Sequence, residues 1–152
     1  MLTIGQQENF MRRAVELARL AADADEIPVA ALIVKDGQVI AEASNRREKD
    51  SDPTAHAEIL ALRAAGKKLG LWNLSGCDMI VTLEPCAMCA GAIVNARLDA
   101  VYFGAYDKRF GYCGTLGNLA ADPRLNHRAL VTGGILEAEC AAILQNFFKS
   151  RR

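Results

Sequence analysis

The amino-acid sequence predicts one α/β domain over residues 1–152, a three-layer helix–sheet–helix sandwich with a central five-stranded mixed sheet. Segments with apolar residues at helical spacing alternate along the chain with short β-branched runs, which is the pattern of helices packed on a sheet. Between two of the strand segments stands the pair Asp36-Gly37, a strong hairpin signal. Because a hairpin joins antiparallel strands, we expect a mixed sheet rather than a parallel one.

The predicted helices have amphipathic patterns and recognisable ends. Phe10, Ala14 and Leu17 share one face of the first helix, and Gly70 marks the end of the second. Pro85 stands at the start of the third, where a missing N–H costs little. The helices are predicted at Gln6–Asp23, His56–Leu69, Cys86–Ala96 and Leu136–Lys149.

The predicted strands are short and apolar. Two long polar stretches interrupt them: 45–55, which contains a proline and should be a surface loop, and 106–127, which is rich in Gly, Asn and Asp and should be irregular with short helices. The strands are predicted at Val29–Val34, Gln38–Ser44, Asp78–Leu83, Ala100–Gly104 and Ala129–Thr132.

Composition narrows the class of protein. A hydrophobic content of 51% with 24% charged residues is typical of a soluble globular domain. No apolar run is long enough to span a bilayer and Met1–Gly5 does not resemble a signal peptide, so we expect no membrane association and a cytoplasmic location. The 18 basic and 18 acidic residues cancel, so any nucleic-acid binding must come from local patches rather than from net charge.

Two short motifs contain the residues with the most specific chemistry. His56–Glu58 reads His-x-Glu, and Pro85–Cys89 reads Pro-Cys-x-x-Cys; together they form the signature of zinc-dependent nucleobase deaminases. One imidazole and two thiolates are the number and kind of protein ligands that a catalytic zinc uses when water takes the fourth position. The sequence therefore predicts that His56, Cys86 and Cys89 bind one Zn²⁺ ion.

The spacing within each motif places some of these residues but not all. Cys86 and Cys89 are three residues apart at a helix start, so they share one face near the positive end of the helix dipole, which favours thiolates. Glu58 is two residues from His56, and on a regular helix such residues point to different sides. The signature, rather than the periodicity, assigns Glu58 as the residue that takes a proton from the attacking water and returns it to the departing amine.

Other interpretations remain open at this point. A lone Cys-x-x-Cys is also a redox motif, although redox chemistry does not require His-x-Glu upstream. His127, the second of the 2 histidines, could close a purely structural zinc site as a fourth ligand. Cys77, Cys113 and Cys140 fit buried apolar residues better than metal ligands.

Beyond the metal motifs, several phrases are similar to those of the bacterial tRNA-specific adenosine deaminases, a branch of the cytidine-deaminase-like superfamily. The resemblance extends over nearly the whole chain, and Ala90–Ala92, Leu125–Arg128 and Gly134–Phe148 narrow it to this branch. It implies a cytidine deaminase-like fold and conversion of the wobble adenosine of a tRNA anticodon to inosine. Water activated by the zinc would attack C6, with Glu58 as the proton shuttle, in a homodimer. Guanine deaminases share the metal motifs and are the alternative.

The resemblance also implies contacts with the substrate. Asn45, which by itself is also a typical turn residue, would hydrogen-bond the target base, and the Ala57 N–H is a candidate to steady developing charge. Tyr106 stands where the family commonly has arginine, and replaces a phosphate contact with a ring that can stack. The remaining substrate-binding residues implied are Val29, Glu84, Asp107 and Asn126. Basic clusters that could contact phosphates of the anticodon arm are Arg46-Arg47, Lys108-Arg109, Arg128 and Lys149–Arg152.

Overall fold

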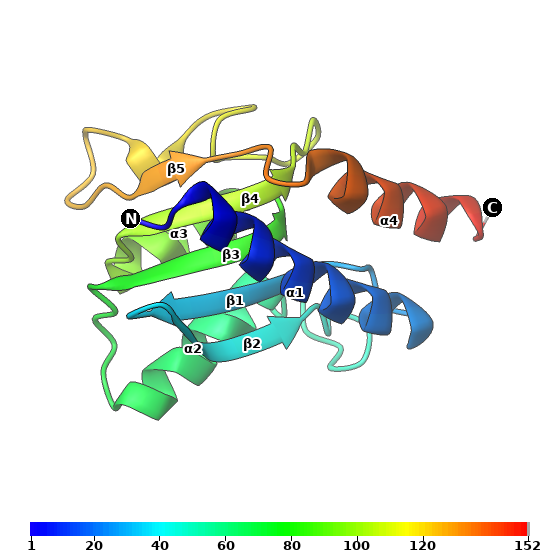
Figure 1. The fold of residues 1–152 in the computed structure, drawn as a ribbon, viewed down its shortest axis with the longest axis horizontal. Helices are drawn as coiled ribbons and strands as arrows, with labels where there is room; N and C mark the ends of the chain where they lie inside the picture. Colours follow the sequence, from blue (N-terminus) through cyan, green and yellow to red (C-terminus); the bar gives the residue numbers. More distant parts are fainter. Residues whose placement is uncertain (152) are drawn as a thin grey trace.

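A five-stranded sheet separates two layers of helices in the computed structural model, which describes residues 1–151 (Figure 1). The strands lie in the order β2-β1-β3-β4-β5. Their bounds are Ala30–Lys35 for β1, Gln38–Ser44 for β2, Cys77–Leu83 for β3, Ala100–Ala105 for β4 and Leu130–Thr132 for β5. The predicted α/β sandwich with a mixed sheet is confirmed.

The strand directions follow from the connections. β1 and β2 form the predicted hairpin, and both Asp36 and Gly37 have positive φ (52° and 75°), as a tight two-residue turn requires. β1 also pairs antiparallel with β3, whereas β3, β4 and β5 are mutually parallel. The C-terminal ends of β3, β4 and β5 therefore lie at the same end of the sheet, and the loops that follow β3 and β4 start there side by side.

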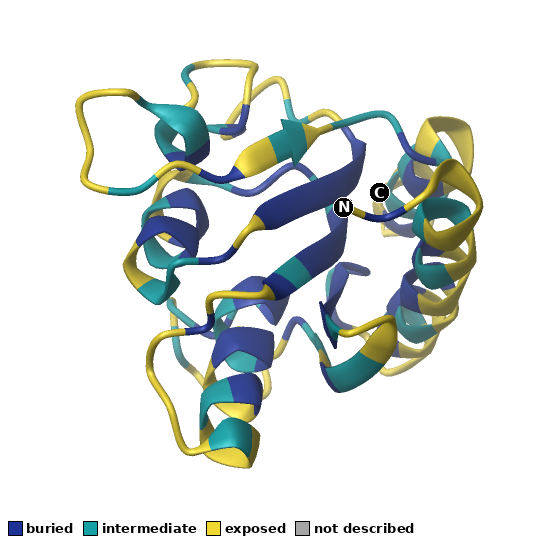
Figure 2. Cartoon of the chain, turned by 60° about the vertical axis from the view of Figure 1, so that its left-hand side comes forward, coloured by how far each residue is buried: buried dark blue, intermediate teal, exposed yellow. Residues whose placement is uncertain are grey.

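Helices cover both faces of the sheet (Figure 2). α1 (Ile4–Asp23) and α4 (Glu137–Lys149) pack on one face, and α2 (Ala57–Leu69) and α3 (Ala87–Ala96) pack on the other. Within the segment 106–127, predicted to be irregular, the structure shows the short 3₁₀ helix η1 (Leu119–Ala121). Among the described residues, no helix has the length and apolarity needed to cross a membrane.

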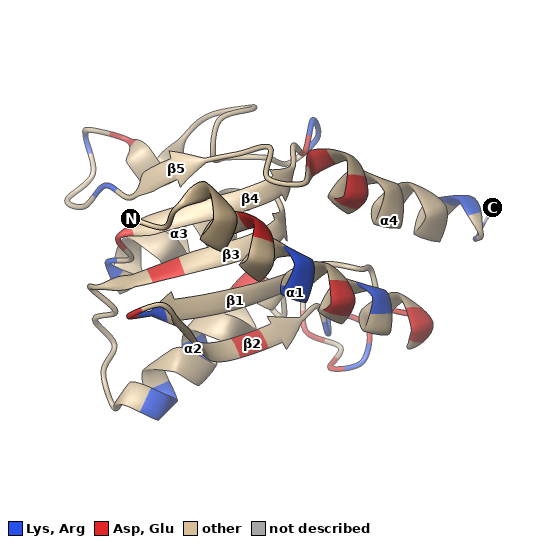
Figure 3. Cartoon of the chain, in the orientation of Figure 1, with Lys and Arg blue, Asp and Glu red and all other residues tan. Residues whose placement is uncertain are grey.

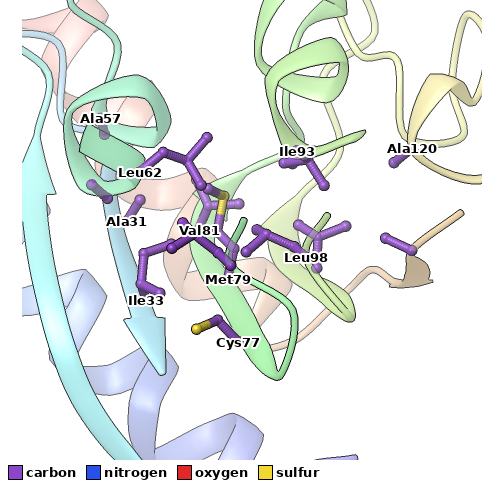
Figure 4. Close-up of a cluster of buried hydrophobic side chains, with 14 of the residues drawn as sticks. Ala31, Ile33, Ala57, Leu62, Cys77, Met79, Val81, Ile93, Leu98 and Ala120 are labelled. Carbon is purple, nitrogen blue, oxygen red and sulfur yellow. The ribbon is translucent and has the colours of Figure 1, made fainter. Parts of the chain in front are cut away.

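Alternate residues of β1, β3 and β4 supply two apolar cores. Leu32 and Ile80 face α1 and α4, while their neighbours Ile33 and Met79 face α2 and α3. Figure 4 shows the core between the sheet and the helices α2 and α3. In it, side chains of β1 and β3 contact Ala57 of α2 and Ile93 of α3. This core anchors the first turns of α2 and α3, and these turns carry the predicted metal ligands.

Element boundaries differ from the prediction by one or two residues. α1 begins at Ile4 instead of Gln6, because the Thr3 side chain accepts a hydrogen bond from the Gln6 N–H and the Gln6 side chain accepts one from Thr3. Charged residues of both signs alternate along the exposed side of α1 (Figure 3). Arg152, the last member of the basic cluster Lys149–Arg152, lies outside the described residues.

Candidate active site

Three predicted metal ligands lie together where α2 and α3 begin. The ligand atoms of His56, Cys86 and Cys89 are all within 4.8 Å of one another. The His56 Nδ1 atom is 3.7 Å from the Cys86 sulfur and 3.6 Å from the Cys89 sulfur. In the part of the chain that the structure describes, no further His, Cys, Asp or Glu joins this group. One imidazole nitrogen and two sulfurs are the donors of an open catalytic zinc site, so the residues present fit a zinc ion.

The backbone just before each helix directs these side chains. His56 and Cys86 are the N-cap residues of α2 and α3, with extended backbone (ψ 150° and 178°), and the helices begin one residue later than predicted. His56 lies before the first helical residue. The rule that residues two apart on a helix point to different sides therefore does not apply to His56 and Glu58. Both line the same cavity. The extended N-cap thus supplies the junction geometry that helical periodicity alone could not provide.

The two thiols of the site are not equivalent. Hydrogen bonds from Cys89 and from His56 lower the pKa of Cys86 to about 4. The neighbouring Cys86 sulfur and burial raise the pKa of Cys89 far above its ordinary value. The hydrogen bond with Cys86 also raises the pKa of His56. The pKa values of the two thiols are thus shifted in opposite directions, and both thiols must lose their protons when a metal binds.

Glu58 is a buried carboxyl group beside these ligands. Its exposed fraction is 4%, and burial raises its pKa above the ordinary value for glutamate. A carboxyl group with a raised pKa holds a proton more readily, which suits a group that must accept a proton and return it.

His56, Cys86 and Glu58 line a cavity of about 750 Å³, a size typical of small-molecule and cofactor sites, while Cys89 is fully buried and does not line it. Most of the predicted site residues contribute to its wall: Val29, Asn45, His56, Ala57, Glu58, Glu84, Cys86 and Asp107. The structure therefore brings together residues from five separate segments of the chain, although their roles toward a substrate stay predictions.

Asn45 and Val29 form one side of this cavity. The Asn45 backbone N–H donates to the Val29 carbonyl (3.0 Å), and the Asn45 Oδ1 atom accepts from the Arg47 N–H (3.1 Å). The side-chain oxygen thus makes the turn that was the simpler interpretation of this residue. Among the described residues its amino group has no hydrogen-bond partner, which leaves that group free to donate to a ligand.

Glu84 is a structural centre of the cavity wall. Its carboxylate accepts hydrogen bonds from the backbone N–H groups of Asp107 (3.1 Å), Cys113 (3.1 Å) and Thr115 (2.9 Å), and from the Thr115 hydroxyl. Gly111 is required beside it, because a Cβ there would lie 2.5 Å from each carboxylate oxygen. The sequence predicted Glu84 as a substrate contact and gave no sign that it holds the loop 106–115 from beneath.

Asn126 and His127 lie elsewhere. Asn126 is exposed and is not among the residues lining the cavity, so its substrate contact stays a prediction without support from this geometry. The His127 Nε2 atom is 2.7 Å from the Leu98 carbonyl oxygen, beyond the C-terminal end of α3, whereas the metal ligands lie at its N-terminal end. The alternative of a zinc site closed by His127 is therefore wrong.

The remaining cysteines are buried thiols, as expected. Cys77, Cys113 and Cys140 are free and almost inaccessible to solvent. Burial raises the pKa of all three, and to about 12 for Cys113 and Cys140. A thiol in this state is a poor ligand and a poor nucleophile.

Basic and aromatic side chains complete the cavity lining. Arg47, Lys108 and Arg109, from two of the predicted basic clusters, line the cavity together with Tyr106. Sequence reasoning missed Phe110, because it lies in an irregular loop where no periodicity marks it. Leu144 and Phe148 of α4 and the apolar residues Ile27 and Leu83 were also missed, because a helix or strand pattern does not show which of its residues face a cavity.

Comparisons with known proteins match this sequence and this fold. The model of the MafB19-like deaminase family matches residues 5–152. The tRNA-specific adenosine deaminase of Bacillus subtilis (strain 168) is 46% identical over 147 residues, which cover 97% of this chain and 91% of that protein. A solved structure from work on A-to-I editing by tRNA:A34 deaminases at the wobble position has a TM-score of 0.86 and 43% identity, and covers 90% of this chain and 99% of that one. A structure of guanine deaminase from Nitrosomonas europaea has a TM-score of 0.78 at 29% identity and covers 90% of this chain and 81% of that one.

Proposed function

This chain belongs to the deaminase family, among the tRNA-specific adenosine deaminases, and from that membership we propose that it converts the wobble adenosine of a tRNA anticodon to inosine. The observation that carries the proposal is the clustering of one imidazole and two thiol donors, two of which line the same cavity as the buried carboxyl group of Glu58. The reaction is hydrolytic: adenine and water become hypoxanthine and ammonia.

We infer that His56, Cys86 and Cys89 hold one zinc ion, since their donor set and spacing suit it. When bound there, zinc supplies a Lewis acid that brings the pKa of water toward neutrality. Glu58 takes a proton from the water that attacks C6 of adenine. It then returns that proton to the exocyclic nitrogen as the C6–N bond breaks, so that ammonia leaves and the carboxylate is regenerated.

The other cavity residues would hold the base during this transfer. The free amino group of Asn45 donates to an acceptor on the edge of the purine, and Val29 packs against the ring. Ala57 opens α2, so its N–H has no carbonyl one turn earlier to pair with and can donate to charge that develops on the ring. Arg47, Lys108 and Arg109 are placed to contact backbone phosphates of the anticodon arm.

A tRNA substrate also sets the expected context of the protein. We propose a cytoplasmic enzyme that acts as a homodimer, as the family resemblance implies, and a single catalytic domain over residues 1–152. The dimer is tested by measuring the molecular mass of the zinc-loaded protein in solution.

A panel of substrates tests the proposed activity. The zinc-loaded protein is offered an anticodon stem-loop with a wobble adenosine, the corresponding DNA, and free guanine, adenine and cytidine. We expect inosine in the RNA, much slower reaction on DNA because 2′-hydroxyl contacts are lost, and no reaction of the free compounds. Turnover of free guanine with inert RNA would instead select the guanine deaminase alternative.

A further inference from the structure

Three exposed aromatic residues line the substrate cavity, Phe148 of α4 and two residues of one loop, Tyr106 and Phe110. Tyr106 is 48% exposed and Phe110 is 63% exposed, and both residues line the cavity that contains Glu58. A single exposed aromatic residue is ordinary, but several that line one cavity beside charged side chains mark a binding surface. Neither Tyr106 nor Phe110 takes part in the chemistry described above.

The Tyr106 ring is held in place from behind. It packs edge-on against Phe103, with ring centroids 5.0 Å apart and an interplanar angle of 87°. Gly133 passes close to both rings, and a Cβ at that position would lie 2.8 Å from the Tyr106 hydroxyl oxygen and would overlap Phe103. The absence of a side chain at Gly133 thus makes room for this arrangement, in which the far side of the Tyr106 ring stays accessible.

The loop that carries the rings is also preorganised. Glu84 accepts the N–H of Asp107 from beneath, and the Asp107 Oδ1 atom accepts the N–H groups of Arg109 (3.0 Å) and Phe110 (3.1 Å). The turn between Tyr106 and Phe110 is therefore closed by hydrogen bonds on two sides. A loop backbone fixed in this way loses little conformational freedom when a ligand binds, which favours its use as a binding platform.

Positive charge beside the rings indicates the kind of ligand. Lys108 and Arg109 lie between Tyr106 and Phe110 in the chain, and Arg47 lines the same cavity from another loop. Accessible rings interleaved with cations are the arrangement with which proteins bind single-stranded nucleic acid, by stacking bases and pairing phosphates. A protein partner would not require three cations at this place.

We propose that the Tyr106 ring stacks on the nucleobase adjacent to the target adenosine, with Phe110 extending the same surface; this inference rests on the proposed function. A target base must leave its stack to enter the cavity, and its neighbour then loses a stacking partner. The Tyr106 ring replaces that partner. Tyr106 is thus a residue that selects an RNA loop over a free base, although it does not touch the reacting atoms.

The test measures whether the ring and the neighbouring base act together. kcat/KM and Kd are determined for the zinc-loaded wild type, Tyr106→Leu and Tyr106→Phe on three stem-loops: intact, abasic 5′ of the target and abasic 3′ of it. Leu116→Ala is the matched control, because Leu116 is an exposed apolar residue that directly follows this loop and does not line the cavity.

We expect Tyr106→Leu to lower kcat/KM on intact RNA by about 5- to 100-fold, the range of base–aromatic stacking, while Tyr106→Phe and Leu116→Ala stay within about twofold of wild type. On one of the two abasic RNAs, Tyr106→Leu should cause no further loss. An equal loss on all three RNAs, or no loss on intact RNA, overturns the stacking proposal while leaving the deaminase activity established. Absence of inosine with the wild type on every RNA contradicts the proposed function itself.

Discussion

Replacing Gly111 with alanine tests whether Glu84 organises the cavity wall. The backbone of Gly111 is not in the positive-φ region, so alanine fits the chain conformation and only the added methyl group matters. That methyl carbon would lie 2.5 Å from both carboxylate oxygens of Glu84. The Glu84 side chain is fully buried and held by hydrogen bonds, so it has little room to move away from the added methyl group.

The size of the effect follows from the bonds that Glu84 makes. It accepts three backbone N–H groups and one hydroxyl. Hydrogen bonds to a charged group contribute about 1.5–3 kcal/mol each, so losing half of the four lowers the free energy of unfolding by about 3–6 kcal/mol. Since small domains are stable by only about 5–15 kcal/mol, Gly111→Ala should be close to unfolded at physiological temperature.

Urea denaturation of the zinc-loaded protein measures this difference, with Gly5→Ala as the control. Gly5 lies in α1, and a Cβ there would find only the Thr3 hydroxyl oxygen, 4.0 Å away. The control should raise the free energy of unfolding by less than about 1 kcal/mol, through helix propensity. The same glycine-to-alanine change should thus lower the free energy of unfolding at Gly111 and raise it at Gly5.

A Gly111→Ala protein within about 0.5 kcal/mol of wild type would refute the reasoning. It would mean that the Glu84 carboxylate is not confined, and that the loop 106–115 does not depend on it. Glu84→Gln provides an independent check, because the amide keeps the size of the side chain but presents N–H groups to donors at one of its two positions. It should be destabilised in the same direction.

Three further results are expected. Glu58→Ala should keep one zinc per chain by metal analysis yet lose on the order of 10²- to 10⁴-fold in kcat, since only the proton transfer is removed; full activity would exclude the shuttle role. His127→Ala should also keep its zinc and lose about 1 kcal/mol of stability with the hydrogen bond to Leu98, whereas loss of zinc would restore the closed-site interpretation. Asn45→Ala should lower kcat/KM on the stem-loop by on the order of tenfold with little change in zinc content, and an unchanged kcat/KM would remove Asn45 from base recognition.

The sequence predicts the sandwich and the clustering of His56, Cys86 and Cys89 well because both depend on local patterns. Alternation of helix and strand segments gives the layers, and the spacing of Cys86 and Cys89 places both on the first turn of one helix. His56 is harder, because its extended backbone is a property of the junction between the loop 45–55 and α2. Helical periodicity therefore argued against Glu58 facing the same site as His56, and only the motif assigned Glu58 the role of proton shuttle.

What the sequence could not predict depends on contacts between distant segments. Glu84 meets Thr115, which is 31 residues away, inside a loop that has no periodic pattern. Phe110 lines the cavity because Asp107 closes the turn before it, and no local signal distinguishes that turn from others rich in Gly and Asp. Loops of this kind are shaped by buried side chains beneath them, so their geometry becomes visible only once the core is known.

The same contacts link the metal ligands to the cavity wall. Glu84 directly precedes Pro85 and Cys86, the Pro85 carbonyl accepts the N–H of Tyr112 (2.8 Å), and Cys86 forms a β-bridge with Gly111. The turn that places a metal ligand is thus also the surface on which the loop 106–115 is built. Gly111→Ala should therefore lower zinc affinity along with substrate binding. Tyr106→Leu changes a half-exposed side chain of the same loop and should lower only the affinity for RNA.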